Sequence, residues 1–172
     1  IRALSISTQG EAFVPISKDR KILGRSIVTF DNRAIEIAER LGKKLDKMRI
    51  FEITGMPLSG VHTLNKIIWW RENDPKIYNN TWKFLCYEDF AYYKMGLVPT
   101  IDYSLAARTM AFDVQKKEWS KEMLEIAEVD VNLFPEAKPS GEIVGELSDS
   151  VASELGLPKG VKAVTGGHDQ PC

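Results

Sequence analysis

Residues 3–30 contain three short runs in which apolar and polar positions alternate, a pattern typical of β-strands. The runs span residues 3–8, 12–16 and 26–30. A charged stretch, residues 18–21, separates the second run from the third. Because polar residues between two alternating runs are typical of a hairpin, we expect these two strands to pair antiparallel.

After residue 33 the apolar positions recur mainly at helical spacing. Residues 34–45 predict an amphipathic helix of about four turns, and the Thr-Gly-Met-Pro sequence at 54–57 breaks the chain beyond it. A second helix is predicted over 61–73 and ends near Asp74-Pro75. Shorter helices are expected over residues 89–94, 123–127 and 151–155, with Ser120 and Ser148 as N-caps of the last two and with Gly96 and Gly156 closing the first and the last.

Two compact apolar runs, residues 82–87 and 161–165, predict further strands. Strands, then helices, then a strand are the order expected of a mixed α/β domain. The chain starts without Met, directly in a strand pattern, and stops shortly after a Gly-Gly-His-Asp sequence. We therefore expect a segment of a longer polypeptide whose fold is incomplete at both ends.

Composition and charge narrow the class of protein. Hydrophobic residues make up 44% and charged residues 27%, which are ordinary globular values and exclude wholesale disorder. The net charge is -1 with acids and bases interleaved, so nucleic acid is a poor partner. No apolar stretch approaches the roughly 18 residues of a membrane span. Cys86 and Cys172 form neither a metal-site spacing nor a disulfide framework, so a reducing cytoplasm fits best.

The strongest candidate chemistry follows the strand predicted over 161–165. Gly166 and Gly167 predict a sharp turn that lets the backbone approach a ligand closely. Asp169 then stands at the carboxyl end of a strand, where α/β sheets usually bind ligands. There it could orient a substrate hydroxyl and accept its proton, and Gln170 could bind a neighbouring hydroxyl. The alternative is an ordinary turn in which Asp169 caps a following helix.

A second candidate follows the first predicted strand. Gln9, Gly10 and Glu11 stand directly after it, and amide and carboxylate side chains suit polyols because each can bridge two adjacent hydroxyls. The alternative is a polar loop tip. His168-Asp169 is a dipeptide that metal-dependent phosphohydrolases use, but only one other histidine, His62, exists, so no metal ligands are predicted.

Taken in chain order, these segments resemble the FGGY carbohydrate kinases, the family of glycerol kinase, xylulokinase, gluconokinase and L-fuculokinase. The resemblance runs through nearly the whole chain. The matching motifs are the strand 4–9 that ends in Gln9, Asp31-Asn32-Arg33, Thr54-Gly55-Met56-Pro57, the signature residues Thr63, Lys66, Ile67, Trp69, Glu72 and Asn73, the stretches 102–104 and 107–110, and Gly167-His168-Asp169-Gln170.

This resemblance implies a ribonuclease H-like (actin-like ATPase) α/β fold with a mixed sheet and flanking helices. It implies that residues 1–172 are part of an N-terminal sugar-binding domain, with the nucleotide-binding domain absent from this chain. The implied activity is ATP-dependent phosphorylation of a hydroxyl on a small sugar or polyol. ATP and Mg²⁺ would be bound mostly by other segments, so the chain alone should be inactive. The oligomeric state stays open, with a homodimer as one option.

The resemblance also implies residue roles. Asp169 would be the catalytic base, and Gln9, Gly10, Glu11 and Gln170 would contact substrate. Gly10 stands where glycerol kinase has an arginine, and Thr29 and Val61 depart from its tryptophan and tyrosine, which favours a bulkier sugar or sugar acid. Two alternatives remain: a non-catalytic sugar-binding relative, and a His-Asp metallohydrolase.

Overall fold

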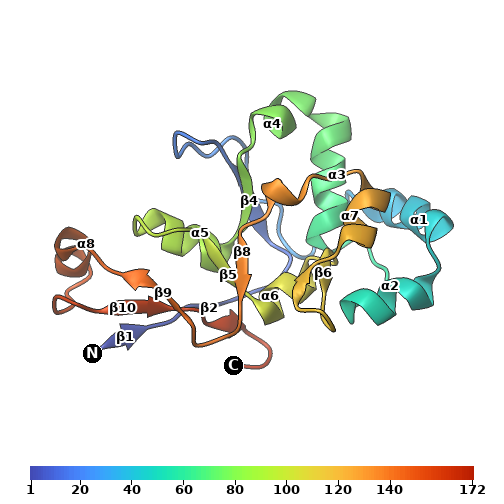
Figure 1. The fold of residues 1–172 in the computed structure, drawn as a ribbon. Coiled ribbons are helices and arrows are strands. Elements are labelled where there is room, and N and C mark those ends of the chain that lie inside the picture. Colours follow the sequence, from blue (N-terminus) through green and yellow to red (C-terminus); the bar gives the residue numbers. More distant parts are fainter.

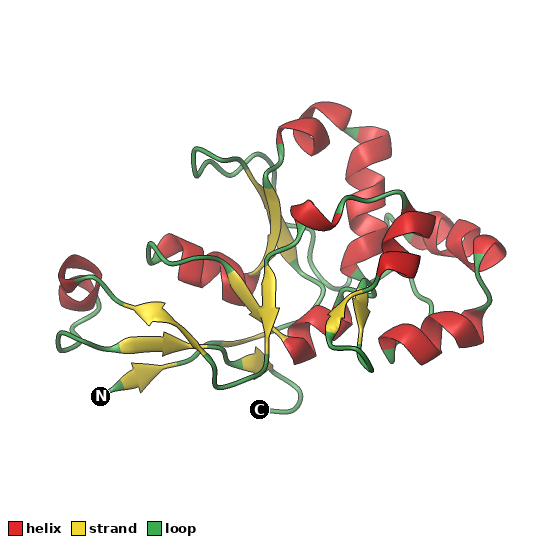
Figure 2. Ribbon diagram, viewed as in Figure 1, coloured by secondary structure: helices red, strands yellow, loops and turns green.

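The structure is a computed structural model that describes residues 1–172. It is an α/β fold with mixed strand pairing, in which short strands gather on one side and most helices on the other (Figure 1, Figure 2). The elements, in chain order, are β1 (Ala3–Leu4), β2 (Ser7–Thr8), β3 (Phe13–Ile16), α1 (Ile35–Lys44), α2 (Lys47–Thr54), α3 (Thr63–Asn73), α4 (Pro75–Asn80), β4 (Lys83–Cys86), α5 (Tyr87–Lys94), β5 (Thr100–Asp102), α6 (Tyr103–Arg108), β6 (Phe112–Asp113), β7 (Glu118–Trp119), α7 (Lys121–Ala127), a 3-10 turn (Val131–Leu133), β8 (Glu136–Lys138), β9 (Ile143–Glu146), α8 (Asp149–Glu154), β10 (Lys162–Val164) and β11 (Gly167–His168).

The N-terminal run forms two short strands instead of one. β1 pairs in parallel with β10, to which β9 adds an antiparallel edge, and β2 pairs in parallel with β11. Both pairs of strands are interrupted at the same level, at residues 5–6 and 165–166. The two backbones lie so close there that a side chain at Gly166 would overlap the carbonyl oxygen of Ile6. The prediction that the two glycines form a sharp turn facing a ligand was therefore wrong. Gly166 permits close approach to a neighbouring strand, and Gly167 already belongs to β11.

The predicted hairpin between the second and third runs is also corrected. β3 pairs antiparallel with β4, from Phe13 opposite Cys86 to Ile16 opposite Lys83. The run 26–30 is no strand and keeps only a single bridge, between Phe13 and Ile27. The reason is burial: β4 offers buried apolar side chains to β3, whereas the chain between β3 and Ile27 is mostly polar and exposed.

The helices pack around a core of 24 buried residues. The predicted helices over 34–45 and 61–73 are confirmed as α1 and α3, and in α3 Trp70 belongs to the core while Trp69 packs against it. α2 was not predicted; the Asp46 side chain caps it, and Gly55 ends it with φ 67°. Ser120 and Ser148 cap α7 and α8 as predicted. None of the helices is both long and apolar enough to cross a membrane.

Candidate functional site

A cavity of about 590 Å³ opens beyond the carboxyl ends of β2 and β11. The five side chains or backbone positions singled out from the sequence all line it: Gln9, Gly10, Glu11, Asp169 and Gln170. The other lining residues are Thr29, Phe30, Met56, Arg108 and His168. The pocket is therefore built from five separate parts of the chain.

Parallel pairing explains why the two predicted segments meet. Ser7 lies opposite Gly167 and Thr8 opposite His168, so both strands end at the same edge. The Asp169 N–H donates to the Thr8 carbonyl oxygen at 2.9 Å, which carries the pairing one residue further. Asp169 begins a turn and caps no helix within the chain, and its side chain is 49% exposed. Its carboxylate is thus free to meet a ligand.

Glu11 differs from Asp169 because its side chain is buried, with 1% exposed. Its carboxylate forms an ion pair with Arg108 at the end of α6. Its carbonyl oxygen accepts a hydrogen bond from the Thr63 hydroxyl at 3.2 Å. The backbone of Glu11 is left-handed, with φ 60°, a conformation that costs about 1 kcal/mol or more and tends to occur at binding sites.

A side chain would not fit at Gly10, because two neighbouring side chains fill the space beside it. A Cβ at Gly10 would lie 3.0 Å from Arg108 Cγ and 3.0 Å from ring atoms of His168. His168 is itself nearly buried, and its Nε2 lies 3.2 Å from Asp169 Oδ1. Each carboxylate of the pocket therefore has a nitrogen partner, Glu11 the Arg108 guanidinium and Asp169 the His168 imidazole.

Thr29 and Phe30 add a hydroxyl and an aromatic ring to the lining, with a buried cation behind them. Thr29 donates from its hydroxyl to the Gly10 carbonyl oxygen at 2.7 Å. Lys66 Nζ is this cation; it donates to the Val28 carbonyl oxygen at 2.7 Å, and burial lowers its pKa to about 8. Phe30 is 86% exposed at the rim of the cavity. A lining that combines polar groups with an exposed aromatic ring suits a molecule with hydroxyl edges and C–H faces.

The model of the FGGY family of carbohydrate kinases, N-terminal domain, matches residues 1–172. This chain belongs to that family. Among curated relatives, the L-fuculokinase of Escherichia coli strain K12 is 25% identical over 169 residues, which cover 98% of this chain and 36% of the relative. The xylulose kinase of Bacillus subtilis strain 168 is 29% identical over 172 residues, which cover 100% of this chain and 34% of the relative.

This FGGY chain thus spans about a third of the length of the curated relatives it matches. The fold agrees with a solved structure of a ligand-bound xylulose kinase from Lactobacillus acidophilus. The two superpose with a TM-score of 0.89 over 98% of this chain and 34% of the solved chain, at 21% sequence identity. At that identity the likeness establishes the fold alone.

Several lining residues of this FGGY site were not found from the sequence. Arg108 lies within the family-like stretch 107–110, but no function was predicted for it. Nothing in the sequence links it to its ion-pair partner Glu11, 97 positions earlier. No function was predicted for Phe30 or Met56 either. Val61, expected near the substrate, does not line the cavity, and Met56 from the preceding Thr-Gly-Met-Pro segment does so instead. The sequence does not show that Glu11 is buried, so the need of its carboxylate for a cation could not be seen before the structure.

Proposed function

We propose that the protein carrying this chain is an ATP-dependent kinase that phosphorylates a hydroxyl of a sugar or sugar-like molecule, with Asp169 as the general base. One observation carries the proposal. The half-exposed Asp169 carboxylate lies at the carboxyl end of β11 on the same cavity as Gln9, Glu11 and Gln170. A base must reach the hydroxyl it deprotonates while other groups hold that hydroxyl's neighbours.

The residues of this chain would bind the substrate and accept one proton from it. The substrate hydroxyl gives its proton to the Asp169 carboxylate, its oxygen forms a bond to the γ-phosphorus of ATP, and the bond from that phosphorus to ADP breaks. Gln9 and Gln170 can each donate and accept hydrogen bonds with substrate hydroxyls. The His168 ring, with Nε2 3.2 Å from Asp169 Oδ1, lies beside this carboxylate and limits the directions it can take. Most of the rate gain in such transfers comes from positioning and charge stabilisation.

Nucleotide and metal would be held mainly by other parts of the protein. The chain has no group of three or more His, Cys, Asp or Glu side chains that could hold a metal ion. In the proposed organisation, residues 1–172 are the sugar-binding part of an N-terminal domain with a ribonuclease H-like fold. A second domain would bring ATP and Mg²⁺, whose role is to screen the phosphate charges, and the chain alone would not turn over.

The test uses the full-length protein and an assay of sugar-dependent ADP release over pentuloses, deoxyketoses, aldonic acids and polyols. Asp169→Asn should lower kcat by about 10²- to 10⁴-fold, the usual contribution of a general base. Sugar affinity, measured by calorimetry, should change by less than about threefold because the asparagine keeps the hydrogen-bonding shape.

Asp149→Asn is the matched control. Asp149 is an exposed aspartate that pairs with Lys159, far from the cavity, and its replacement should leave kcat unchanged. Near-normal turnover in the Asp169 variant would disprove the assigned role. No sugar-dependent ADP release from the wild-type protein with any member of the panel would argue against the proposed activity itself.

A further inference from the structure

Glu88 on α5 is a fully buried carboxylate that lies outside the cavity, with 0% of its side chain exposed. Its oxygens accept hydrogen bonds from two backbone N–H groups on different segments. Oε1 accepts from the Gly166 N–H at 2.6 Å, and Oε2 accepts from the Asp102 N–H at 2.9 Å. Glu88 therefore ties the segment between β10 and β11 to the end of β5.

A second path leads from the same carboxylate to the other side of Gly167. Asp102, held by Glu88, accepts at Oδ1 from the Ser104 hydroxyl at 3.1 Å. The Ser104 Oγ in turn accepts from the His168 N–H at 2.8 Å. The backbone is thus fixed at Gly166 directly and at His168 through two intermediates, which leaves Gly167 held between two anchored neighbours.

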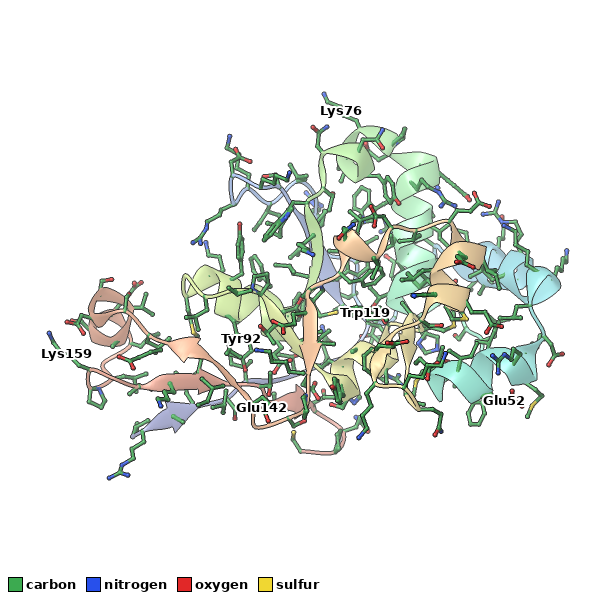
Figure 3. All side chains as sticks on the ribbon, in the orientation of Figure 1. Glu52, Lys76, Tyr92, Trp119, Glu142 and Lys159 are labelled. Carbon is green, nitrogen blue, oxygen red and sulfur yellow. The ribbon has the colours of Figure 1, made fainter.

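Tyr92 completes this arrangement one helical turn after Glu88. Its hydroxyl lies 2.7 Å from the Val164 carbonyl oxygen and 3.2 Å from Glu88 Oε1. Figure 3 shows Tyr92 between α5 and the strands below it. The end of β10 and the start of β11 are therefore both held from α5.

The support matters because the strand that presents Asp169 is very short. β11 has two residues and pairs with a two-residue partner, β2, so the strand ladder alone holds it weakly. Beyond it, residues 169–172 are exposed. A small rotation at Gly166 or His168 would redirect the Asp169 carboxylate away from the cavity.

We propose that Glu88 is a positioning residue for the reaction: its buried carboxylate fixes the backbone from Gly166 to His168 and so sets the direction in which Asp169 points. This inference rests on the role proposed for Asp169. Glu88 itself touches neither the cavity nor any reacting atom. Its contribution passes through hydrogen bonds to backbone N–H groups and, toward His168, through the Asp102 and Ser104 side chains.

The arrangement requires Glu88 to be ionised, because both of its oxygens face N–H donors. Burial and, less strongly, the nearby Asp102 carboxylate raise the pKa of Glu88 to about 7, despite the lowering effect of the two N–H donors and the Tyr92 hydroxyl. The other titratable groups around it are Asp89, Tyr92 and Cys86 of the same segment, none of them a cation. As pH falls through about 7, Glu88 gains a proton and loses the charge that strengthens its bonds to the Gly166 and Asp102 N–H groups, so the anchor loosens.

Glu88→Gln in the full-length protein tests the proposal. Glutamine keeps the shape but replaces one acceptor with an NH₂ that faces a backbone N–H. We expect kcat to fall about 10- to 100-fold, the usual cost of losing a charge-assisted bond and leaving a buried donor unpaired, with KM changed less than about threefold. The fall of kcat on acidification through pH 7 should also become shallower, because glutamine does not titrate.

Asp89→Asn is the matched control. Asp89 is the next residue, equally buried, and accepts from the Cys86 N–H at 3.1 Å without touching residues 166–169. It should lower stability but change kcat less than about twofold. Should the Glu88 variant not fold, Tyr92→Phe removes the hydroxyl contact and should lower kcat about three- to tenfold.

Amide hydrogen exchange separates this inference from the proposed function. Corrected for intrinsic rates, exchange of Gly166 and His168 should be about tenfold faster or more in Glu88→Gln and unchanged in Asp89→Asn. Faster exchange in a protein without kinase activity would uphold the anchor and reject the kinase proposal. Unchanged exchange with unchanged kcat in Glu88→Gln would overturn the role of Glu88.

Discussion

Arg108→Met should destabilise the protein more than removing the charge of its partner, Glu11. The ion pair is asymmetric, since the Glu11 side chain is 1% exposed and the Arg108 side chain is 30% exposed. Removing Arg108 leaves a buried carboxylate without a counter-charge, which typically costs 3–5 kcal/mol. Because the cavity admits water beside the pair, we expect the lower end, about 3 kcal/mol.

Glu11→Gln leaves the other partner unpaired, and the guanidinium can turn toward water. Its cost should therefore be near that of a partly exposed pair, about 1 kcal/mol. The double variant removes both charges and leaves no buried ion, so it should cost only about 1–2 kcal/mol, less than Arg108→Met alone. The expected coupling between the two sites is therefore about 2–3 kcal/mol.

The assay is urea unfolding of the full-length protein, followed by tryptophan fluorescence, since the chain has four tryptophans. Arg49→Met is the control: Arg49 pairs with Glu122 at 2.7 Å, but both side chains are exposed, so the midpoint should hardly move. An Arg108→Met cost no greater than that of Glu11→Gln, or additive costs in the double variant, would refute the inference that Glu11 is a buried anion held by Arg108.

Three further predictions concern the same region. Gly166→Ala should lower kcat at least about 100-fold in steady-state assays, because its Cβ would overlap the Ile6 carbonyl and displace β11; normal kinetics would contradict this. Phe30→Ala should raise sugar KM about five- to tenfold with an unchanged unfolding midpoint, because Phe30 is 86% exposed; an unchanged KM would remove it from the site. The pKa of Lys66 is about 8 in the folded chain, against 10.5 for a free side chain, so between these pH values the unfolded chain binds more protons. The free energy of unfolding should therefore rise from pH 8 to 10.5. In Lys66→Met this rise should disappear.

Helix positions were largely predictable from the sequence, because their signals are local. The apolar spacing of α1 and the cap residues Ser120 and Ser148 depend on neighbours within four positions. Strand partners were not predictable, because the sequence does not show that β3 pairs with β4, about 70 residues away, and not with the segment that follows β3 directly. α2 was missed because its cap, Asp46, lies directly after the apolar run of α1.

The site divides in the same way. Gln9 and Asp169 were predictable because each follows a strand, and parallel neighbours end at one edge. Arg108, His168 and Glu88 were not predictable because their contacts are with segments distant in the sequence. Arg108 pairs with Glu11, His168 lies against Gly10, and Glu88 accepts from the Gly166 N–H. A glycine can mark a position where neighbouring side chains leave no room for a Cβ, but the sequence does not say which side chains these are. In the sequence, Gly10 stands where glycerol kinase has an arginine. In the structure, the side chains of Arg108 and His168 fill the space beside Gly10 that a side chain there would need.

The two carboxylates of the cavity are therefore suited to different work. Glu11 is enclosed, strained and bound to a guanidinium, so its charge is balanced and its direction is fixed before any substrate arrives. Asp169 keeps about half of its side chain exposed and has only the His168 ring beside it, so it can meet a hydroxyl and take its proton. A fixed anion can orient a polyol, and a free one can deprotonate it. That difference in surroundings, more than the residue types, favours Asp169 over Glu11 as the base.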